Sequence, residues 1–154
     1  MDFSSFLQEI GAAAHLDTSA AAQAGGCTIV FSATMEVTFE HDAKTQVVQV
    51  FAPVLAAGEW PVELRARILA SVLELHLFGL ATDGNYFGFD SQLDRIMFFR
   101  SIALPGLAPA QAVQAVESFV NQLERLQSHL ARAAVAQAAP SVTEKPKPLS
   151  MQRV

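Results

Sequence analysis

Residues 28–54 read TIVFSATMEVTFEHDAKTQVVQVFAPV, and this stretch decides the fold class of the 154-residue chain. Within it, residues 36–40 (EVTFE) alternate polar and apolar side chains with the period of two that a half-buried β-strand shows. Residues 42–45 (DAKT) have the polar composition of a turn, and residues 47–52 form the return strand. Together with the β-branched residues 27–32, the stretch predicts three strands joined as an antiparallel meander.

Helical patterns flank this meander on both sides. Residues 2–14 carry apolar side chains at i, i+3, i+4 and i+7, and two later segments repeat the helical period. Because the strands arrive in hairpins without βαβ crossovers, we predict an α+β fold, with an antiparallel sheet flanked by helices. The predicted order is α-β-β-β-α-β-β-α, with the later helices over residues 61–78 and 110–137 and the second hairpin over residues 86–89 and 95–104.

Two segments lack a clear pattern of either kind. Residues 20–26 (AAAQAGG) are small and end in two glycines, so they are interpreted as a flexible connector. Residues 138–154 (AAPSVTEKPKPLSMQRV) contain three prolines and scattered charges, and they cannot bury enough apolar surface to offset the cost of ordering. The sequence therefore predicts one domain over residues 1–137 and a disordered tail over residues 138–154.

The composition narrows the class of partner. A net charge of −5 gives no electrostatic basis for binding nucleic acid. No run of about 18 apolar residues is present and the N-terminus lacks a basic signal region, so a cytoplasmic protein with no membrane partner is expected. Hydrophobic residues make up 51% of the chain against 16% charged residues. This surplus of apolar residues favours a second subunit or a bound client that buries part of the apolar surface.

Motifs for catalysis or metal binding are missing from the sequence. It contains no GxSxG, no HExxH and no phosphate-binding glycine loop. Cys27 is the single cysteine and lies in an apolar strand, where a thiol is usually inert. The histidines His15, His41, His76 and His129 share no ligand spacing. We therefore expect no enzyme activity and no catalytic, cofactor-binding or metal-binding residues.

The helix predicted over residues 61–78 is apolar on two sides. One row consists of Val62, Ala66, Leu69 and Leu73, and a second row consists of Leu64, Ile68, Val72 and Leu75. A helix that packs on one sheet needs a single apolar stripe, so two rows indicate burial on two sides. Either the last helix of the same chain covers the second row, or a second copy of this helix does so across a two-fold axis. We favour the second alternative, a homodimer.

The order of these elements, together with specific residues, resembles a known family. The meander over residues 28–54, the apolar segment LASVLELHLFGLATDG at residues 69–84 and the hairpin NYFGFDSQLDRIMFFRSIAL at residues 85–104 are similar to class I type III secretion chaperones, the Tir chaperone family. The resemblance extends over about residues 1–135.

The resemblance implies a function and two surfaces. Such chaperones are small, acidic, cytoplasmic homodimers that serve virulence by holding the extended N-terminal segment of a type III secreted effector in a secretion-competent form. They catalyse no reaction of their own, and the secretion ATPase releases the client. Carried onto this chain, the client-binding residues are Phe3, Phe6, Leu7, Ile10 and Phe31, and the dimer contacts are Leu64, Ile68, Val72 and Leu75.

An alternative from another class is a small dimeric α+β domain that binds a ligand or regulates another protein. It predicts a deep pocket with convergent polar groups, where a chaperone needs long apolar grooves.

Overall fold

The computed structural model describes residues 1–138 apart from residues 34, 57, 59 and 80. The helices are α1 (Phe3–Ala14), α2 (Ser19–Ala24), α3 (Val62–His76) and α4 (Pro109–Ala138), with a 3₁₀ turn, η1, at Leu77–Gly79. The strands are β1 (Gly26–Ser32), β2 (Met35–Asp42), β3 (Val47–Ala56), β4 (Tyr86–Asp90) and β5 (Arg95–Ala103). Beyond residue 138, the predicted tail lies outside the described residues, and the domain boundary stays a prediction.

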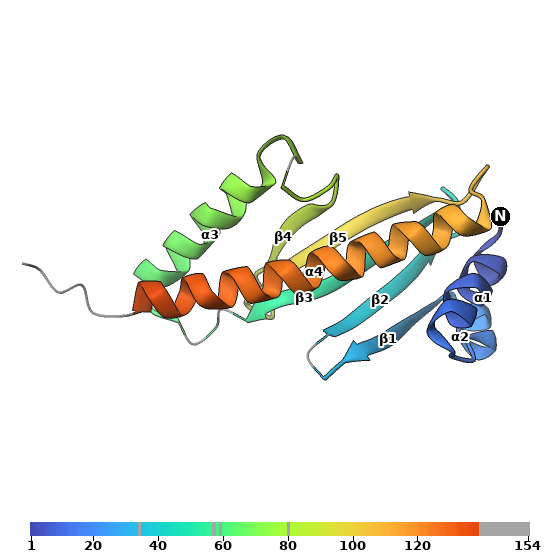
Figure 1. Cartoon of the computed structure of the whole chain (residues 1–154), viewed down its shortest axis with the longest axis horizontal. Helices are drawn as coiled ribbons and strands as arrows, with labels where there is room; N and C mark the ends of the chain where they lie inside the picture. Colours follow the sequence, from blue (N-terminus) through green and yellow to red (C-terminus); the bar gives the residue numbers. More distant parts are fainter. Residues whose placement is uncertain (34, 57, 59, 80, 139–154) are drawn as a thin grey trace, which may run out of the picture.

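All five strands belong to one antiparallel sheet with the order β1-β2-β3-β5-β4 (Figure 1). The predicted α+β class and antiparallel sheet with flanking helices are confirmed. β5 lies between β3 and β4, and its side chains alternate between a buried face and a half-buried face. Phe98 is fully buried on the side of α4, while Phe99 points to the opposite face, where it lies beside Phe51 of β3.

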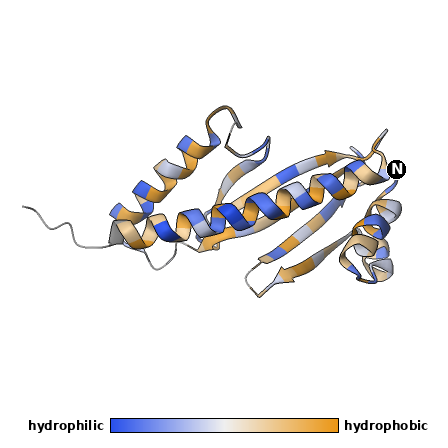
Figure 2. Cartoon of the chain, in the orientation of Figure 1, coloured by the Kyte–Doolittle hydropathy of each residue, from blue (hydrophilic) through white to orange (hydrophobic). Residues whose placement is uncertain are grey.

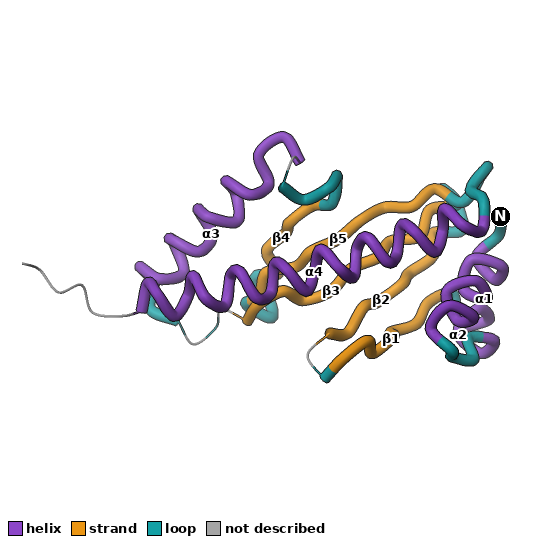
Figure 3. Tube along the Cα trace, in the orientation of Figure 1, coloured by secondary structure: helices purple, strands orange, loops and turns teal. Residues whose placement is uncertain are grey.

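α4 crosses one face of the sheet and closes the main core (Figures 1 and 3). The ring of Phe119 in α4 stacks on Phe98 of β5 with ring centroids 5.2 Å apart, and Phe98 in turn contacts Phe87 of β4 at 5.1 Å. Polar residues occupy the side of α4 that faces away from the sheet (Figure 2). The single apolar stripe of this helix is therefore used on the sheet.

α1 is fixed at one end of the sheet. The Asp2 carboxylate caps the helix by accepting the Ser5 N–H at 2.8 Å, and this hydrogen bond lowers the pKa of Asp2. Phe3 stacks on His41 of β2 with ring centroids 4.7 Å apart. The Met1 ammonium group donates to the Leu104 carbonyl at 3.0 Å. These contacts join the start of the chain to the sheet.

The predicted connector at residues 20–26 is wrong in its first part, because Ser19–Ala24 form helix α2. Alanine has the highest helix propensity, and the Asp17 carboxylate accepts the Ser19 N–H just before the helix starts. Gly25, at φ 78°, ends the helix in the left-handed conformation that glycine adopts without strain. Thr18 links α2 to α1 by donating its hydroxyl to the Leu7 carbonyl at 2.9 Å.

α3 lies at the other end of the molecule, beside β4 and the second half of α4 (Figure 1). The Arg65 guanidinium forms an ion pair of 2.8 Å with Asp94 in the β4–β5 turn. The chain leaves α3 through Phe78, which has a positive φ of 59°. The following loop is attached to α4, because Ser118 donates to the Asp83 carboxylate and Gln122 donates to the Ala81 carbonyl.

Candidate functional site

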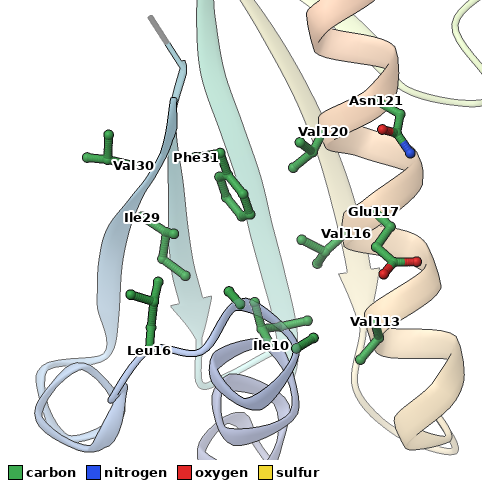
Figure 4. A pocket seen from close by; sticks show the side chains of 12 residues that line it. Ile10, Leu16, Ile29, Val30, Phe31, Val113, Val116, Glu117, Val120 and Asn121 are labelled. Carbon is green, nitrogen blue, oxygen red and sulfur yellow. The ribbon is translucent and has the colours of Figure 1, made fainter. Parts of the chain in front are cut away.

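An apolar groove of about 450 Å³ lies between α1, β1 and α4 (Figure 4). Ten of its twelve lining residues are apolar; the two polar ones are Glu117 and Asn121. The apolar lining consists of Ile10, Ala13, Ala14, Leu16, Ile29, Val30, Phe31, Val113, Val116 and Val120. We call this cavity the α1 groove. Its chemistry suits apolar side chains of a partner and offers few groups to orient a polar ligand.

The walls of the α1 groove come from facing elements. Phe31 points from β1 toward α4, and Val116 and Val120 point back toward β1 (Figure 4). Glu117 and Asn121 stand on the outer side of α4, at the rim (Figure 4). The groove exists because α1 ends at Ala14 and leaves the middle of α4 without a covering helix.

The structure separates the predicted client-binding residues into two groups. Phe3, Phe6 and Leu7 are buried in the core of the protomer. Ile10 is also largely buried but contributes to the floor of the α1 groove, and Phe31 is half-buried in its wall. Of the five residues, only Ile10 and Phe31 line the α1 groove, because the apolar stripe of α1 packs the helix onto the sheet; their role in client binding stays a prediction.

Several groove residues had no site assigned from the sequence. The sequence patterns assign Leu16, Ile29, Val116 and Val120 to no binding surface. A helical period shows which residues form the apolar face of a helix. It does not show which part of that face stays uncovered by neighbouring elements.

A second cavity of about 490 Å³ continues along α4 from the α1 groove. It is lined by Ser32, Met35, Val54, Leu55, Ala56, Glu124, Gln127, Ser128 and Ala131. Gln127 donates its side-chain amide to the Pro53 carbonyl at 3.2 Å, which holds α4 against β3 at this point. We call this cavity the β3 groove.

The predicted dimer contacts on α3 are placed on its inner side. Leu64, Ile68 and Val72 are buried within the protomer, and Leu75 is half-buried. Within the protomer these side chains pack against the core, and their role as dimer contacts stays a prediction. The other row is the exposed one, with Val62 at 75% and Leu73 at 69% of full exposure. Leu77 and Phe78 of η1 extend this exposed row, which we call the α3 ridge.

The described residues offer little for chemistry. Burial raises the pKa of the Cys27 thiol, which keeps it protonated and a poor nucleophile near neutral pH. In the part of the chain that the structure describes, no three His, Cys, Asp or Glu side chains come together as a metal site. Within the same residues, no helix is long and apolar enough to cross a membrane.

Comparison of the sequence with known protein families gives a match to one. The model of the family described as Tir chaperone protein (CesT) matches residues 5–127, which is most of the chain. The chain belongs to the Tir chaperone protein family. Among curated protein sequences, none matches this Tir chaperone family member closely enough to count as a relative.

Three solved structures with the same fold as this Tir chaperone family member are complexes of two proteins. One is titled as the complex of ExsC and ExsE; it has a TM-score of 0.61 at 18% identity, over 86% of this chain and 96% of that chain. A second is the HopA1–SchA chaperone–effector complex, with a TM-score of 0.58 at 14% identity, over 83% of this chain and 98% of that one. A third is the heterodimeric ExoU–SpcU complex of the Pseudomonas aeruginosa type III secretion system, with a TM-score of 0.57 at 10% identity, over 81% and 93% of the two chains.

At these identities the likeness concerns the fold. It agrees with the resemblance that the hairpin and the apolar helix indicated from the sequence. The family match over residues 5–127 is what assigns the chain to the Tir chaperone family.

Proposed function

We propose that this protein binds the extended N-terminal segment of a type III secreted effector and keeps it competent for secretion. The observation that carries this proposal is the α1 groove, an apolar cavity with only two polar lining residues on a member of a chaperone family. Apolar grooves of this kind take the alternate side chains of a bound extended segment.

The sheet offers a second means of recognition beside the α1 groove. β1 is the first strand in the sheet order, and within the described residues no strand pairs with its outer edge. An exposed strand edge can form main-chain hydrogen bonds with an extended peptide, while neighbouring pockets select its side chains. The edge of β1 and the wall of the α1 groove share Ile29 and Phe31, so one bound segment can use both.

A substitution at the rim of the α1 groove tests the proposal. Leu16 is 47% exposed, so Leu16→Asp places a charge in the groove without opening the core. The matched control is Leu93→Asp in the β4–β5 turn, where the side chain is also exposed. A secreted effector is first identified by co-purification with the tagged chain, and its N-terminal peptide is then titrated by calorimetry. We expect at least a tenfold loss of affinity for Leu16→Asp alone, since more than about 1.4 kcal/mol of apolar contact is removed. Equal binding by both variants would show that the groove does not hold the client.

We place the homodimer contact on the α3 ridge. The main support for this assignment is Phe78, whose side chain is 85% exposed and whose backbone has a positive φ of 59°. A bulky residue in this conformation is strained, and strain persists where a site has a use for it. Tyr86 of β4 is also exposed near this end of α3, with its ring 5.7 Å from His76. Aromatic side chains of this kind are enriched in interfaces.

Sedimentation equilibrium of Leu73→Asp tests the homodimer. We expect a monomer for this variant and a dimer for the parent chain at micromolar concentration, with Leu16→Asp as a control that stays dimeric. A parent chain that is monomeric throughout this range would exclude the homodimer. Because the two variants lie on different surfaces, each is the control for the other.

We also propose that the chain has no enzyme activity of its own, that it acts in the cytoplasm and that the secretion ATPase releases its client. The raised pKa of the single thiol and the apolar lining of the α1 groove support a binding role. The alternative, a domain that binds a small ligand, needs polar groups that converge in a deep pocket. Glu117 and Asn121 stand at the rim, so this alternative has less support.

A further inference from the structure

The α1 groove and the β3 groove lie one after the other along α4, and we call the two together the trough. Val113 to Asn121 line the first groove, and Glu124 to Ala131 line the second, on the same side of the helix. On the sheet side, Phe31 lines the first groove and its neighbour Ser32 lines the second. No turn of α4 separates the two linings.

The length of the trough follows from the rise of α4. Eighteen residues separate Val113 from Ala131, which corresponds to about 27 Å at the helical rise of 1.5 Å per residue. An extended chain advances about 3.3 Å per residue, so about eight residues fill the trough from end to end. Half of them would direct their side chains to the apolar floor and half to the rim, because side chains alternate along an extended chain.

The charges in the trough have one sign. Glu117 lines the α1 groove and Glu124 lines the β3 groove, both with exposed side chains, and no Lys, Arg or His lines either one. The nearest arginines on α4 lie outside both linings, and Arg132 donates to the Ser128 carbonyl of its own helix. The two glutamates are seven residues apart, or about 10 Å along the helix. This spacing falls between two and four residues of an extended chain, which are the separations at which its side chains point to the same side.

We infer that the trough selects a client segment of about eight residues with apolar side chains on one side and basic side chains on the other. This inference rests on the proposed function, since it describes the client that the α1 groove takes. The basic residues lie opposite Glu117 and Glu124, and the apolar residues fill the two grooves. Length and apolar contacts give the affinity, and the two glutamates reject segments with acidic side chains.

Defined peptides replace the client in the test. Three fluorescently labelled eight-residue peptides alternate leucine with a polar residue, and the polar positions hold lysine and serine, glutamate and serine, or serine alone. Binding to the full chain is measured by fluorescence anisotropy at low and at high salt. We expect about tenfold tighter binding of the lysine peptide than of the glutamate peptide at low salt, with a smaller difference at high salt.

Charge reversal separates the trough from the net charge of the protein. The variant Glu117→Lys with Glu124→Lys should reverse the preference, so that the glutamate peptide binds more tightly. The matched control is Glu63→Lys with Glu74→Lys, which changes the net charge by the same amount at two exposed positions of α3. We expect the control to keep the preference for lysine. A reversal by both pairs would show a general effect of charge and overturn the inference.

The remaining outcomes distinguish this inference from the proposed function. Equal binding of all three peptides would overturn the selection of basic segments and leave the apolar groove in place. A series of four, eight, twelve and sixteen residues should gain affinity up to about eight residues, which is the number that the trough length predicts, and a continued gain would overturn that length. If no peptide binds, the proposed groove itself is wrong. If peptide binding falls as protein concentration rises, a second copy occupies the trough, and the inference is also wrong.

Discussion

Replacing Phe78 by glycine should have opposite effects on the protomer and on the dimer. In the protomer the Phe78 ring is 85% exposed, so its removal takes little apolar surface out of the core. Its backbone, at φ 59° and ψ 9°, lies in the left-handed region, which costs a non-glycine residue about 1–2 kcal/mol. Glycine removes this cost but loses about 0.5–1 kcal/mol more entropy on folding. The net change is between zero and about 1.5 kcal/mol of added stability.

The dimer should respond in the other direction. If Phe78 inserts into the partner, a two-fold axis makes the contact appear twice. Truncation of an aromatic contact in an interface typically costs about 1–2 kcal/mol or more, so two of them amount to about 2–4 kcal/mol. This corresponds to a dissociation constant on the order of 30- to 1,000-fold higher.

The two effects are measured separately. Urea unfolding is compared at a concentration where both proteins are monomeric, because association adds to apparent stability. With an m-value of about 2 kcal/mol/M, the midpoint should stay the same or rise by up to about 0.75 M. Sedimentation equilibrium then gives the dissociation constants. Phe78→Ala is the control, since it removes the ring and keeps the strained backbone. A Phe78→Gly protein with a midpoint lowered by more than about 0.5 M, or with unchanged dimerisation, would refute the reasoning.

Three further predictions concern the protomer. Phe119→Ala should lower the free energy of unfolding by about 3–5 kcal/mol, because the ring is buried and stacked on Phe98. Phe119→Leu should lower it by less than about 1.5 kcal/mol, because most of the apolar volume is kept. Equal urea midpoints for the two variants would contradict this. Asp90 accepts the Leu93 N–H, and this hydrogen bond holds the pKa of Asp90 in the folded protein below its usual value. The stability that ionised Asp90 contributes is therefore present above about pH 4 and is lost as the pH falls through the folded pKa. Asp90→Asn should therefore flatten the acid end of a plot of stability against pH, and an unchanged curve would count against the assignment. The Arg65–Asp94 ion pair is partly exposed, so a double-mutant cycle with alanine should give a coupling energy of at most about 1 kcal/mol that decreases with salt. A larger coupling energy that does not depend on salt would mean that the pair is effectively buried.

The strands and long helices could be predicted because their signals are local. The alternation in residues 36–40 and the helical period of residues 110–137 follow from the geometry of the backbone, and neighbouring elements cannot change them. Helix α2 was missed because a run of alanine before two glycines gives no apolar period. The helix is held by the hydrogen bond from the Ser19 N–H to Asp17 and by the contact of Thr18 with α1, which a sequence pattern does not show.

The sequence by itself determined the α+β class, the order of the elements and the two apolar rows of the central helix. Only the tertiary structure decided which row is free. Leu64 and Leu73 have the same side chain on the same helix, yet the first is buried and the second is exposed, because the first lies on the inner side of α3. The α1 groove has the same origin, since α1 ends at Ala14 while α4 continues past it. Hydrophobicity is a property of each residue, but exposure depends on the distant elements that cover it.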